Sequence, residues 1–288
     1  MRLPVPANTV PTDTVSANTR AAPRRHPFGL AEALHAEWTK TRTTASTSWL
    51  LLAAIALTVA VGAAAAAGTS CPSGVVCQVD PAKVSLTGID LGQAVVAMVA
   101  VLAISNEYST GMIRITLSAM PRRTVVLAAK AAVLSGLVLA AGTIAVLGSV
   151  LAGRLILSGH GFTPAHGYEL LSLDSPTVLR AAAGSVLYLA LVALLSLGVA
   201  TAVRDSAVAI GIVLGLLYLF PIVANVVGNA HWHRHLEQIG PMTAGLAIQA
   251  TTDLTSLPIS PWAGLGVLAA WAAAALLAGG LVLRLRDA

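Results

Sequence analysis

Charged residues are scarce in this sequence. Asp, Glu, Lys and Arg make up 10% of its 288 residues, whereas hydrophobic residues make up 56%. An average soluble domain carries about 25% charged residues. Together with a mean hydropathy of +0.81, this excludes a disordered chain, a collagen, a disulfide scaffold and an ordinary soluble enzyme. The composition indicates an integral membrane protein, and its richness in Ala, Gly, Val and Arg is typical of a bacterial source.

Lysine is the scarcest charged residue, with only Lys40, Lys83 and Lys130 in the chain. None of the three follows a glycine, so the phosphate-binding Gly-Lys-[Ser/Thr] loop of P-loop ATPases is absent. The sequence also lacks the His-Glu-x-x-His motif of zinc proteases and the Gly-x-Ser-x-Gly motif of acyl-transfer enzymes. We therefore expect no enzymatic site in this chain.

Long apolar runs are nearly free of charge. A helix needs about 20 apolar residues to cross a bilayer core of roughly 30 Å, and six runs meet this length: 48–67, 86–105, 125–147, 178–203, 207–228 and 262–283. We expect an all-α membrane protein with six transmembrane helices. Ion-coupled carriers usually keep ionisable groups near the middle of the membrane. Here Asp90 lies about one turn inside its run, and Lys130 can extend to the cytosol. An ion-coupled transporter or channel is therefore the less favoured alternative.

Basic residues are distributed unevenly between the two sides of the predicted membrane. With the N-terminus in the cytosol, 13 of the 17 Lys and Arg residues are cytosolic, and the four outside are Lys83, Arg154, Arg180 and Arg234. The positive-inside rule then favours a cytosolic N-terminus and C-terminus. Because topology accounts for the basic residues, we expect no nucleic-acid partner. The predicted location is the bacterial plasma membrane.

The sequence before the first apolar run divides into two parts. Residues 1–27 are rich in Pro, Thr, Asn and Arg, which predicts a disordered cytosolic tail. The next residues predict an amphipathic helix on the inner leaflet, with Glu37 and Lys40 off its apolar face. Its position close to the first span favours this location over that of a short soluble helix. The apolar face is formed by Leu30, Ala31, Leu34 and Trp38.

Two groups of polar residues fall in the predicted outer segments. Cys71 and Cys77 are the only cysteines. Outside the membrane they can form a disulfide, and two unpaired thiols are the alternative. The second group is His231, His233 and His235. A metal site needs three or four converging ligands, and no Asp or Cys lies close by in the sequence. We therefore expect polar residues at the membrane interface rather than a metal site.

Small residues recur at every fourth position in two of the apolar runs. Such stripes allow two helix backbones to approach closely. We expect them to pack against helices of the same chain, with a dimer interface as the alternative. The stripes consist of Ala128, Ala132, Gly136 and Ala140 in the third run, and of Ala207, Gly211 and Gly215 in the fifth.

The most informative segment is 106–124, between the second and third runs. Its second residue, Glu107, is acidic, and Pro121 ends a pattern of apolar residues at helical spacing. This pattern predicts a short amphipathic helix on the cytosolic face. The alternative is a loop that only fixes topology, for which Arg122 and Arg123 would be enough. The apolar pattern is formed by Met112, Ile113, Ile115, Thr116 and Met120.

This segment resembles the corresponding loop in the membrane permeases of type-2 ABC transporters. In that family the second span ends in Glu and an aromatic residue. Gly and Arg follow, and then Pro and Arg before the third span. The residues at these positions are Glu107, Tyr108, Gly111, Arg114, Pro121, Arg122 and Arg123. The resemblance extends over residues 28–288 and includes the interfacial helix.

The resemblance implies a six-span permease domain, residues 28–288, that forms the translocation path of an ATP-driven exporter. Segment 106–124 would then be a coupling helix that docks on a separate P-loop ATPase subunit. That subunit would bind ATP and Mg²⁺, and this chain would need no cofactor of its own. Because six spans are half of such an exporter, the resemblance also implies a permease homodimer, or a heterodimer with a similar permease.

Overall fold

The computed structural model describes residues 29–71, 79–112, 115–116, 123–162 and 171–286. Every regular element in these ranges is a helix, which confirms the expected all-α class. Six segments are long and apolar enough to cross a membrane, and each overlaps one predicted run. They are Ala45–Ala67, Pro81–Ser109, Arg123–Gly159, Pro176–Val203, Ser206–Val226 and Pro261–Leu285. The tail predicted at residues 1–27 lies outside the described residues.

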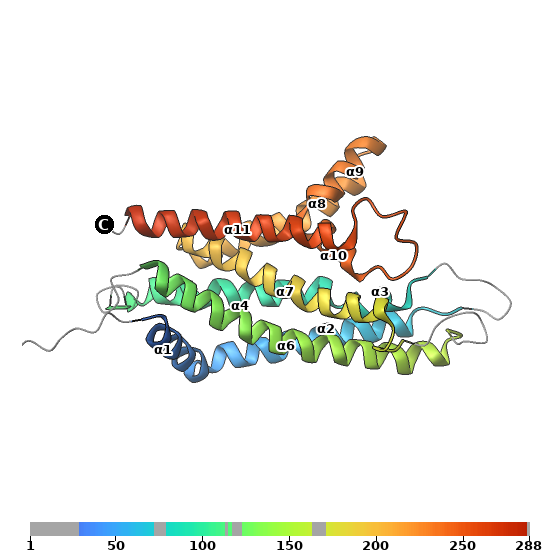
Figure 1. The fold of residues 1–288 in the computed structure, drawn as a ribbon, viewed down its shortest axis with the longest axis horizontal. Coiled ribbons are helices and arrows are strands. Elements are labelled where there is room, and N and C mark those ends of the chain that lie inside the picture. The colour runs from blue at the N-terminus through green and yellow to red at the C-terminus, as the bar shows by residue number, and fades with distance from the viewer. Residues whose placement is uncertain (1–28, 72–78, 113–114, 117–122, 163–170, 287–288) are drawn as a thin grey trace, which may run out of the picture.

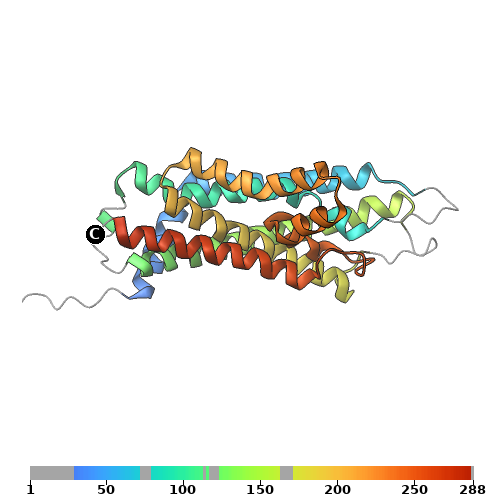
Figure 2. The same ribbon diagram turned by 90° about the horizontal axis from the view of Figure 1, so that it is seen from above.

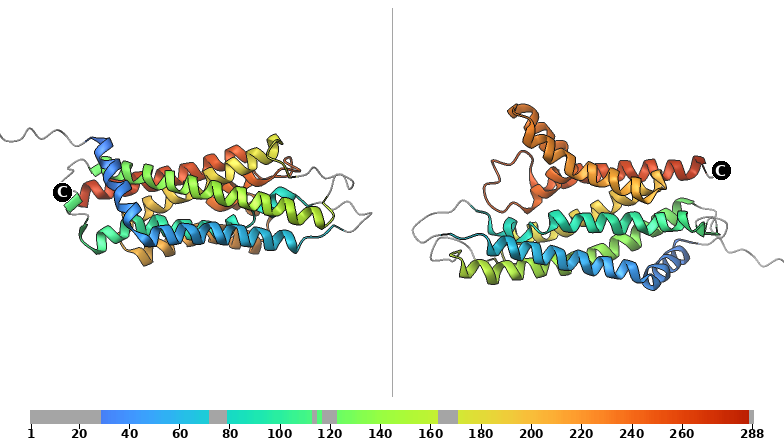
Figure 3. Two further views of the ribbon diagram at one scale, coloured as in Figure 1. Left: turned by 90° about the horizontal axis from the view of Figure 1, so that it is seen from below. Right: turned by 180° about the vertical axis from the view of Figure 1, so that it is seen from behind.

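The long helices run along the long axis of an elongated bundle (Figures 1 and 2). They are α2 (Ala45–Ala67), α4 (Ile89–Ser109), α6 (Arg123–Gly159), α7 (Pro176–Val203), α8 (Ser206–Val226) and α11 (Pro261–Arg286). Helix α1 (Leu30–Thr43) lies obliquely across one end of this bundle (Figure 3), which is also the end at which α11 finishes. We call this the α1 end.

Short helices occupy the opposite end, which we call the α9 end (Figure 1). Helix α9 projects from the body of the bundle. The other short elements precede α4 or lead into α11. The short elements are α3 (Pro81–Leu86), α9 (Ala230–Ile239), α10 (Pro241–Leu246) and the 3₁₀ helix η2 (Ala247–Gln249).

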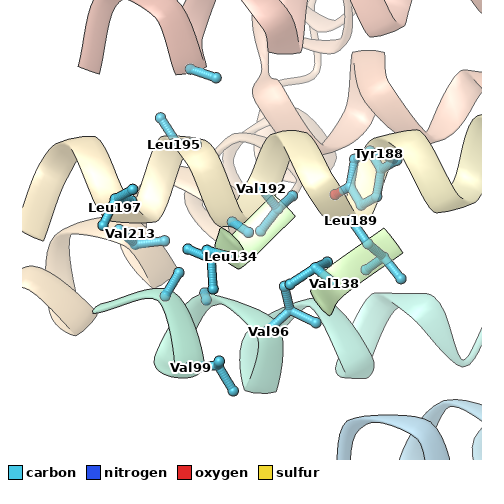
Figure 4. Packing of buried hydrophobic residues seen from close by; sticks show 14 of the residues in the cluster. Val96, Val99, Leu134, Val138, Tyr188, Leu189, Val192, Leu195, Leu197 and Val213 are labelled. Atoms are coloured by element: carbon cyan, nitrogen blue, oxygen red, sulfur yellow. The ribbon is translucent and has the colours of Figure 1, made fainter. Parts of the chain in front are cut away.

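Helix α7 is the most extensively buried of the six long helices. It is apolar on every side, which is typical of a helix enclosed by others. Figure 4 shows its side chains packed between those of α4, α6 and α8. The labelled core residues are Tyr188, Leu189, Val192, Leu195 and Leu197 of α7, Val96 and Val99 of α4, Leu134 and Val138 of α6, and Val213 of α8.

Helix α6 is longer than the third apolar run predicted it to be. Its 37 residues extend roughly 55 Å at 1.5 Å per residue, whereas a bilayer core is roughly 30 Å thick. The additional turns continue to the α9 end, where Leu157 belongs to a second hydrophobic cluster with Phe162 and Leu171. Part of the segment between the third and fourth spans is therefore helix, because it has its own apolar partners.

The second span is broken into α3 and α4 near Thr87. Asp80 caps α3 by accepting the backbone N–H groups of Ala82 and Lys83, and α4 begins after Gly88. A Cβ atom on Gly88 would overlap the backbone oxygen of Thr58 on α2. Glycine at this position therefore allows the start of α4 to pack directly on α2.

The two small-residue stripes face outward instead of packing inside the chain. All seven residues are exposed. A Cβ on Gly136, Gly211 or Gly215 would meet no atom within 4 Å in the described part of the chain. The expectation that these stripes pack against helices of the same chain is therefore wrong. Close packing within the chain uses other glycines, such as Gly198, where α7 meets the backbone of α11.

Candidate functional site

Four charged side chains from three helices meet at the α1 end. Glu37 and Lys40 belong to α1, Glu107 to the last turn of α4 and Lys130 to the beginning of α6. The Oε2 atom of Glu37 lies 2.6 Å from Lys130 Nζ, and its Oε1 atom lies 2.7 Å from Lys40 Nζ. Glu107 Oε1 lies 3.0 Å from each of the two ammonium nitrogens. We call these four residues the charge cluster.

The charge cluster is buried apart from one side chain. Glu37 is 1% exposed, Lys130 5% and Glu107 7%, whereas the Lys40 side chain is 30% exposed. Burying an unpaired charge costs several kcal/mol. Two carboxylates and two ammonium groups balance here, and Lys130 Nζ also donates to the Ala103 carbonyl at 3.1 Å. The cluster is tolerated inside the protein because its opposite charges pair.

Burial and ion pairing act in opposite directions on the two α1 side chains. Burial alone would raise the pKa of Glu37, but the ammonium groups of Lys130 and Lys40 hold that pKa below its ordinary value of 4.5. Burial alone would lower the pKa of Lys40, but its hydrogen bonds to Glu37 and Glu107 hold that pKa above its ordinary value of 10.5. Ion pairing therefore prevails, and both groups are charged at neutral pH.

Sequence analysis identified Glu107 but not its partners. The expectation that Lys130 extends to the cytosol is wrong, because its ammonium group pairs with Glu37 and Glu107 inside the protein. The sequence did contain one sign that Lys130 has a partner, because it is the single charged residue within the apolar run 125–147. The sequence could not pair it, because the partners lie 93 and 23 residues away.

The interfacial helix is confirmed as a helix, but its contacts differ from the expectation. Leu30 and Trp38 are 52% and 47% exposed, and Leu34 is half-buried. The opposite face packs on the bundle, where Ala33 and Glu37 are buried. The apolar face is thus left open to the surroundings, and the charged residue Glu37 faces the protein.

Two further contacts tie the ends of segment 106–124 to distant helices. The Arg204 guanidinium carbon lies 5.4 Å from the centroid of the Tyr108 ring, which links α4 to the turn between α7 and α8. Arg123 Nη1 donates to the Leu283 carbonyl at 2.8 Å, which links the start of α6 to the end of α11. Both sides of the segment are therefore attached to the last three spans.

The middle of the segment is described only in part. Gly111 has a φ of +71°, a left-handed conformation that favours glycine, directly after the end of α4. Thr116 is buried, with its Oγ1 atom 3.5 Å from Lys40 Nζ, whereas Ile115 is 70% exposed. The segment thus returns toward the charge cluster. Arg114, Pro121 and Arg122 lie outside the described residues, as does most of the predicted amphipathic helix.

The α9 end is held by a carboxylate and by a disulfide. Asp80 Oδ2 accepts the backbone N–H groups of Thr251 and Thr252 at 2.5 and 3.1 Å, and its Oδ1 atom accepts the Thr251 hydroxyl at 2.7 Å. Cys71 is disulfide-bonded, and Cys77 lies outside the described residues. Asp80 therefore joins the segment between α2 and α3 to the segment before α11.

The three histidines of α9 point to different partners. His231 Nε2 lies 3.2 Å from His235 Nε2, and the two rings meet edge to face one turn apart. His233 Nδ1 instead lies 2.8 Å from the Ala224 carbonyl, and its Nε2 lies 3.5 Å from Glu237 Oε1. The three rings do not converge on a common point. In the described part of the chain, no three His, Cys, Asp or Glu side chains are grouped to hold a metal ion.

Comparison with known proteins identifies no family for this chain. No protein-family model matches the chain, and no curated protein matches it. The functional interpretation therefore rests on the charge cluster, on the arrangement of the spans and on the residues of segment 106–124.

Proposed function

We propose that this chain is the membrane permease subunit of an ATP-driven exporter of the type-2 ABC class. It lies in the plasma membrane of a bacterium with both termini in the cytosol. One observation carries the proposal: the charge cluster fastens the start of segment 106–124 to α1 and α6 as well as to α4. An amphipathic loop that only fixed topology would need no such attachment.

The charge cluster gives a physical route from the segment to the spans. Glu107 lies at the end of α4, immediately before the segment, and pairs with one residue of α1 and one of α6. Breaking a buried ion pair by displacing one partner costs about 3–5 kcal/mol. A push on the segment therefore moves α1, α4 and α6 together, as the rigid-body motion of a transporter half requires.

The proposal requires two partners, an ATPase and a second permease, and exposed surfaces of this chain are available for both. A separate P-loop ATPase binds ATP and Mg²⁺ and docks on segment 106–124, where Met112 and Ile115 are exposed. A second permease, identical or similar, completes the translocation path. The outward-facing stripes on α6 and α8 support this partner, because exposed small residues allow close contact between helices in a membrane.

Co-purification and ATP hydrolysis test the proposal. The full chain is expected to co-purify with a P-loop ATPase and to change its hydrolysis rate. Ile115→Asp should abolish binding, because it places a charge on the exposed docking surface. Glu107→Gln should keep binding but remove the effect on hydrolysis. Glu32→Gln, a change to an exposed α1 carboxylate, is the control. The proposal fails if Ile115→Asp and Glu107→Gln both behave like the control.

An ion-coupled carrier is the second candidate, and the charge cluster itself favours it. Glu107 Oε2 is buried without a hydrogen-bond partner among the described residues, as a proton-binding carboxylate could be. Against this, all four charged groups lie at one end of the bundle and are already paired. Uptake into vesicles that contain no nucleotide, abolished when the proton gradient collapses, would support the carrier and contradict the exporter.

A further inference from the structure

An open groove of about 290 Å³ lies between α6 and α11 toward the α1 end. Within it, Gly280 of α11 faces α6, where an added Cβ atom would lie 3.7 Å from Leu127 Cδ2. Because glycine carries no side chain, space remains between the two helices at this level. The apolar walls include Leu127 and Ala131 of α6 and Leu276, Leu277 and Leu281 of α11.

One end of the groove is polar, and it coincides with the ends of two apolar runs. Thr124 directly precedes the run 125–147, and Arg284 directly follows the run 262–283. Both line the groove, whose other described lining residues are Leu, Ala and Gly. Since an apolar run fills the bilayer core, the residues next to it lie at the level of the lipid head groups. The groove therefore leads from the head groups into the hydrocarbon region.

The polar end carries positive charge. Arg284 is exposed. Two further arginines donate to neighbouring carbonyls of α11, Arg123 Nη1 to Leu283 at 2.8 Å and Arg204 Nη2 to Val282 at 3.5 Å. These two guanidinium groups offset the negative end of the α11 dipole, which would otherwise disfavour an anion beside Arg284. No carboxylate is among the described residues that line the groove, so its polar end favours an anion.

The charge of the groove distinguishes between two possible occupants. A second copy of the chain could cover an apolar groove, but a two-fold interface uses the same patch of both copies. Each copy would then bring its own arginines to the other, with no lining carboxylate to pair with them. An anionic phospholipid instead supplies the opposite charge together with an acyl chain. Basic pockets between transmembrane helices bind such lipids in other membrane proteins.

We propose that this groove binds an anionic phospholipid. Its phosphate pairs with Arg284 and accepts the Thr124 hydroxyl, and one acyl chain lies along the leucines of α6 and α11. Arg284 provides the charge-assisted hydrogen bond, which is the stronger of the two. A zwitterionic lipid also offers a phosphate, but its cationic group would enter the field of the same arginines. The site therefore selects lipids by the net charge of their head groups, whether or not the chain is an exporter.

Lipid retention by the purified full chain tests the site. The protein in detergent is incubated with equal amounts of dioleoyl phosphatidylglycerol and phosphatidylcholine, and the retained lipids are measured by native mass spectrometry. Arg284→Gln should lower the ratio of glycerol lipid to choline lipid by about fivefold, because one basic side chain near a membrane surface contributes about 1 kcal/mol. Arg154→Gln, which removes the charge of another exposed arginine of the chain, is the control and should leave the ratio unchanged.

A second variant tests the apolar part of the groove. Gly280→Leu fills the space between α6 and α11 and should reduce retention of phosphatidylglycerol while Arg284 is still present. Gly136→Leu is the matched control, because a Cβ there would meet no atom within 4 Å in the described part of the chain. If Gly280→Leu does not fold, Arg284→Gln keeps the test decisive, since it changes an exposed side chain.

Four results would overturn the proposal. The first is an equal lipid ratio in Arg284→Gln and Arg154→Gln. The second is equal retention of phosphatidylglycerol by Gly280→Leu and Gly136→Leu. The third is competition by soluble glycerol phosphate as strong as that by phosphatidylglycerol, which would replace the lipid by a soluble anion. The fourth is conversion of dimers to monomers by Gly280→Leu with lipid retention unchanged, which would assign the groove to a second copy.

Discussion

The two ends of the bundle are held together by different forces. At the α1 end, α1, α4 and α6 are joined by four charged side chains that form ion pairs with one another. At the α9 end, Asp80 and Arg180 hold the loop before α11 through its backbone. Asp80 accepts the N–H groups of Thr251 and Thr252, and Arg180 Nη2 donates to the Ala250 carbonyl.

The difference shows which end is suited to transmit a movement. A hydrogen bond to the backbone fixes a loop locally and needs no second charged side chain. A buried cluster of four charges makes the positions of three helices interdependent, because displacement of one helix leaves an unpaired charge on another. We therefore expect the α1 end to move as a unit and the α9 end to open at its loops.

Removal of Glu37 should produce the largest effect. Glu37→Ala leaves Lys130 buried with one carboxylate instead of two, so we expect a loss of about 3–5 kcal/mol in the stability of the α1 end. The measurement is thermal unfolding in detergent, combined with limited proteolysis of α1. Glu32→Gln on the exposed face of α1 is the control. If Glu37→Ala unfolds like the control, the cluster does not hold α1 to the bundle.

A change of pH should weaken the α1 end from both sides. The pKa of Glu37 lies below 4.5 in the folded protein, so its contribution is present above pH 4.5 and is lost as the pH falls through the lowered value. The pKa of Lys40 lies above 10.5, so its contribution is present below pH 10.5 and is lost as the pH rises through the raised value.

The docking of α1 can be followed over this range with a spin label on Thr39→Cys. Its mobility should stay constant between about pH 5 and 10 and should increase outside that window. In Glu37→Gln the acid-side increase should disappear, because the titrating carboxyl is absent. Mobility that rises steadily through neutral pH would show that other groups control the docking of α1.

Loss of the Asp80 carboxylate should have a smaller and local effect. Asp80→Asn keeps one oxygen to cap α3 but replaces the other by an amide NH₂ group, which cannot accept the N–H groups of Thr251 and Thr252, so we expect a loss of about 1–3 kcal/mol. Hydrogen exchange should accelerate at the amides of Thr251 and Thr252 and stay unchanged in α1. Asp174→Asn, at an exposed position, is the control. Faster hydrogen exchange in α1 as well would mean that the α1 end and the α9 end are coupled, which would contradict the local role given to the Asp80 bonds.

The smallest change in stability is expected on the outward stripes. Gly136→Ala adds a methyl group that meets no atom within 4 Å in the described part of the chain. The stability of the single chain should therefore rise by up to about 1 kcal/mol through helix propensity. Gly198→Ala is the contrasting variant, because its methyl group would overlap the backbone of Ala275. Equal effects of the two changes on thermal unfolding would contradict the packing described for α6 and α7.

The apolar runs predicted the spans because a bilayer core imposes a minimum length and an apolar composition on every helix that crosses it. The same signal could not predict the full length of α6, because the turns beyond residue 147 depend on packing with Leu157 and its neighbours. It also could not orient the small-residue stripes, since small residues allow close approach equally well to a helix of the same chain or of another.

The sequence by itself determined that this protein is a bundle of six apolar helices, preceded by an amphipathic helix, because hydrophobic runs and helical periodicity are properties of neighbouring residues. It also singled out Glu107 by its place at the end of a span. Only the tertiary structure decided that Glu107 shares Lys40 and Lys130 with Glu37. These residues come from three helices and lie up to 93 positions apart in the chain. Ion pairs depend on distance in space. Only folding brings these charged groups together, in ion pairs of 3.0 Å or less.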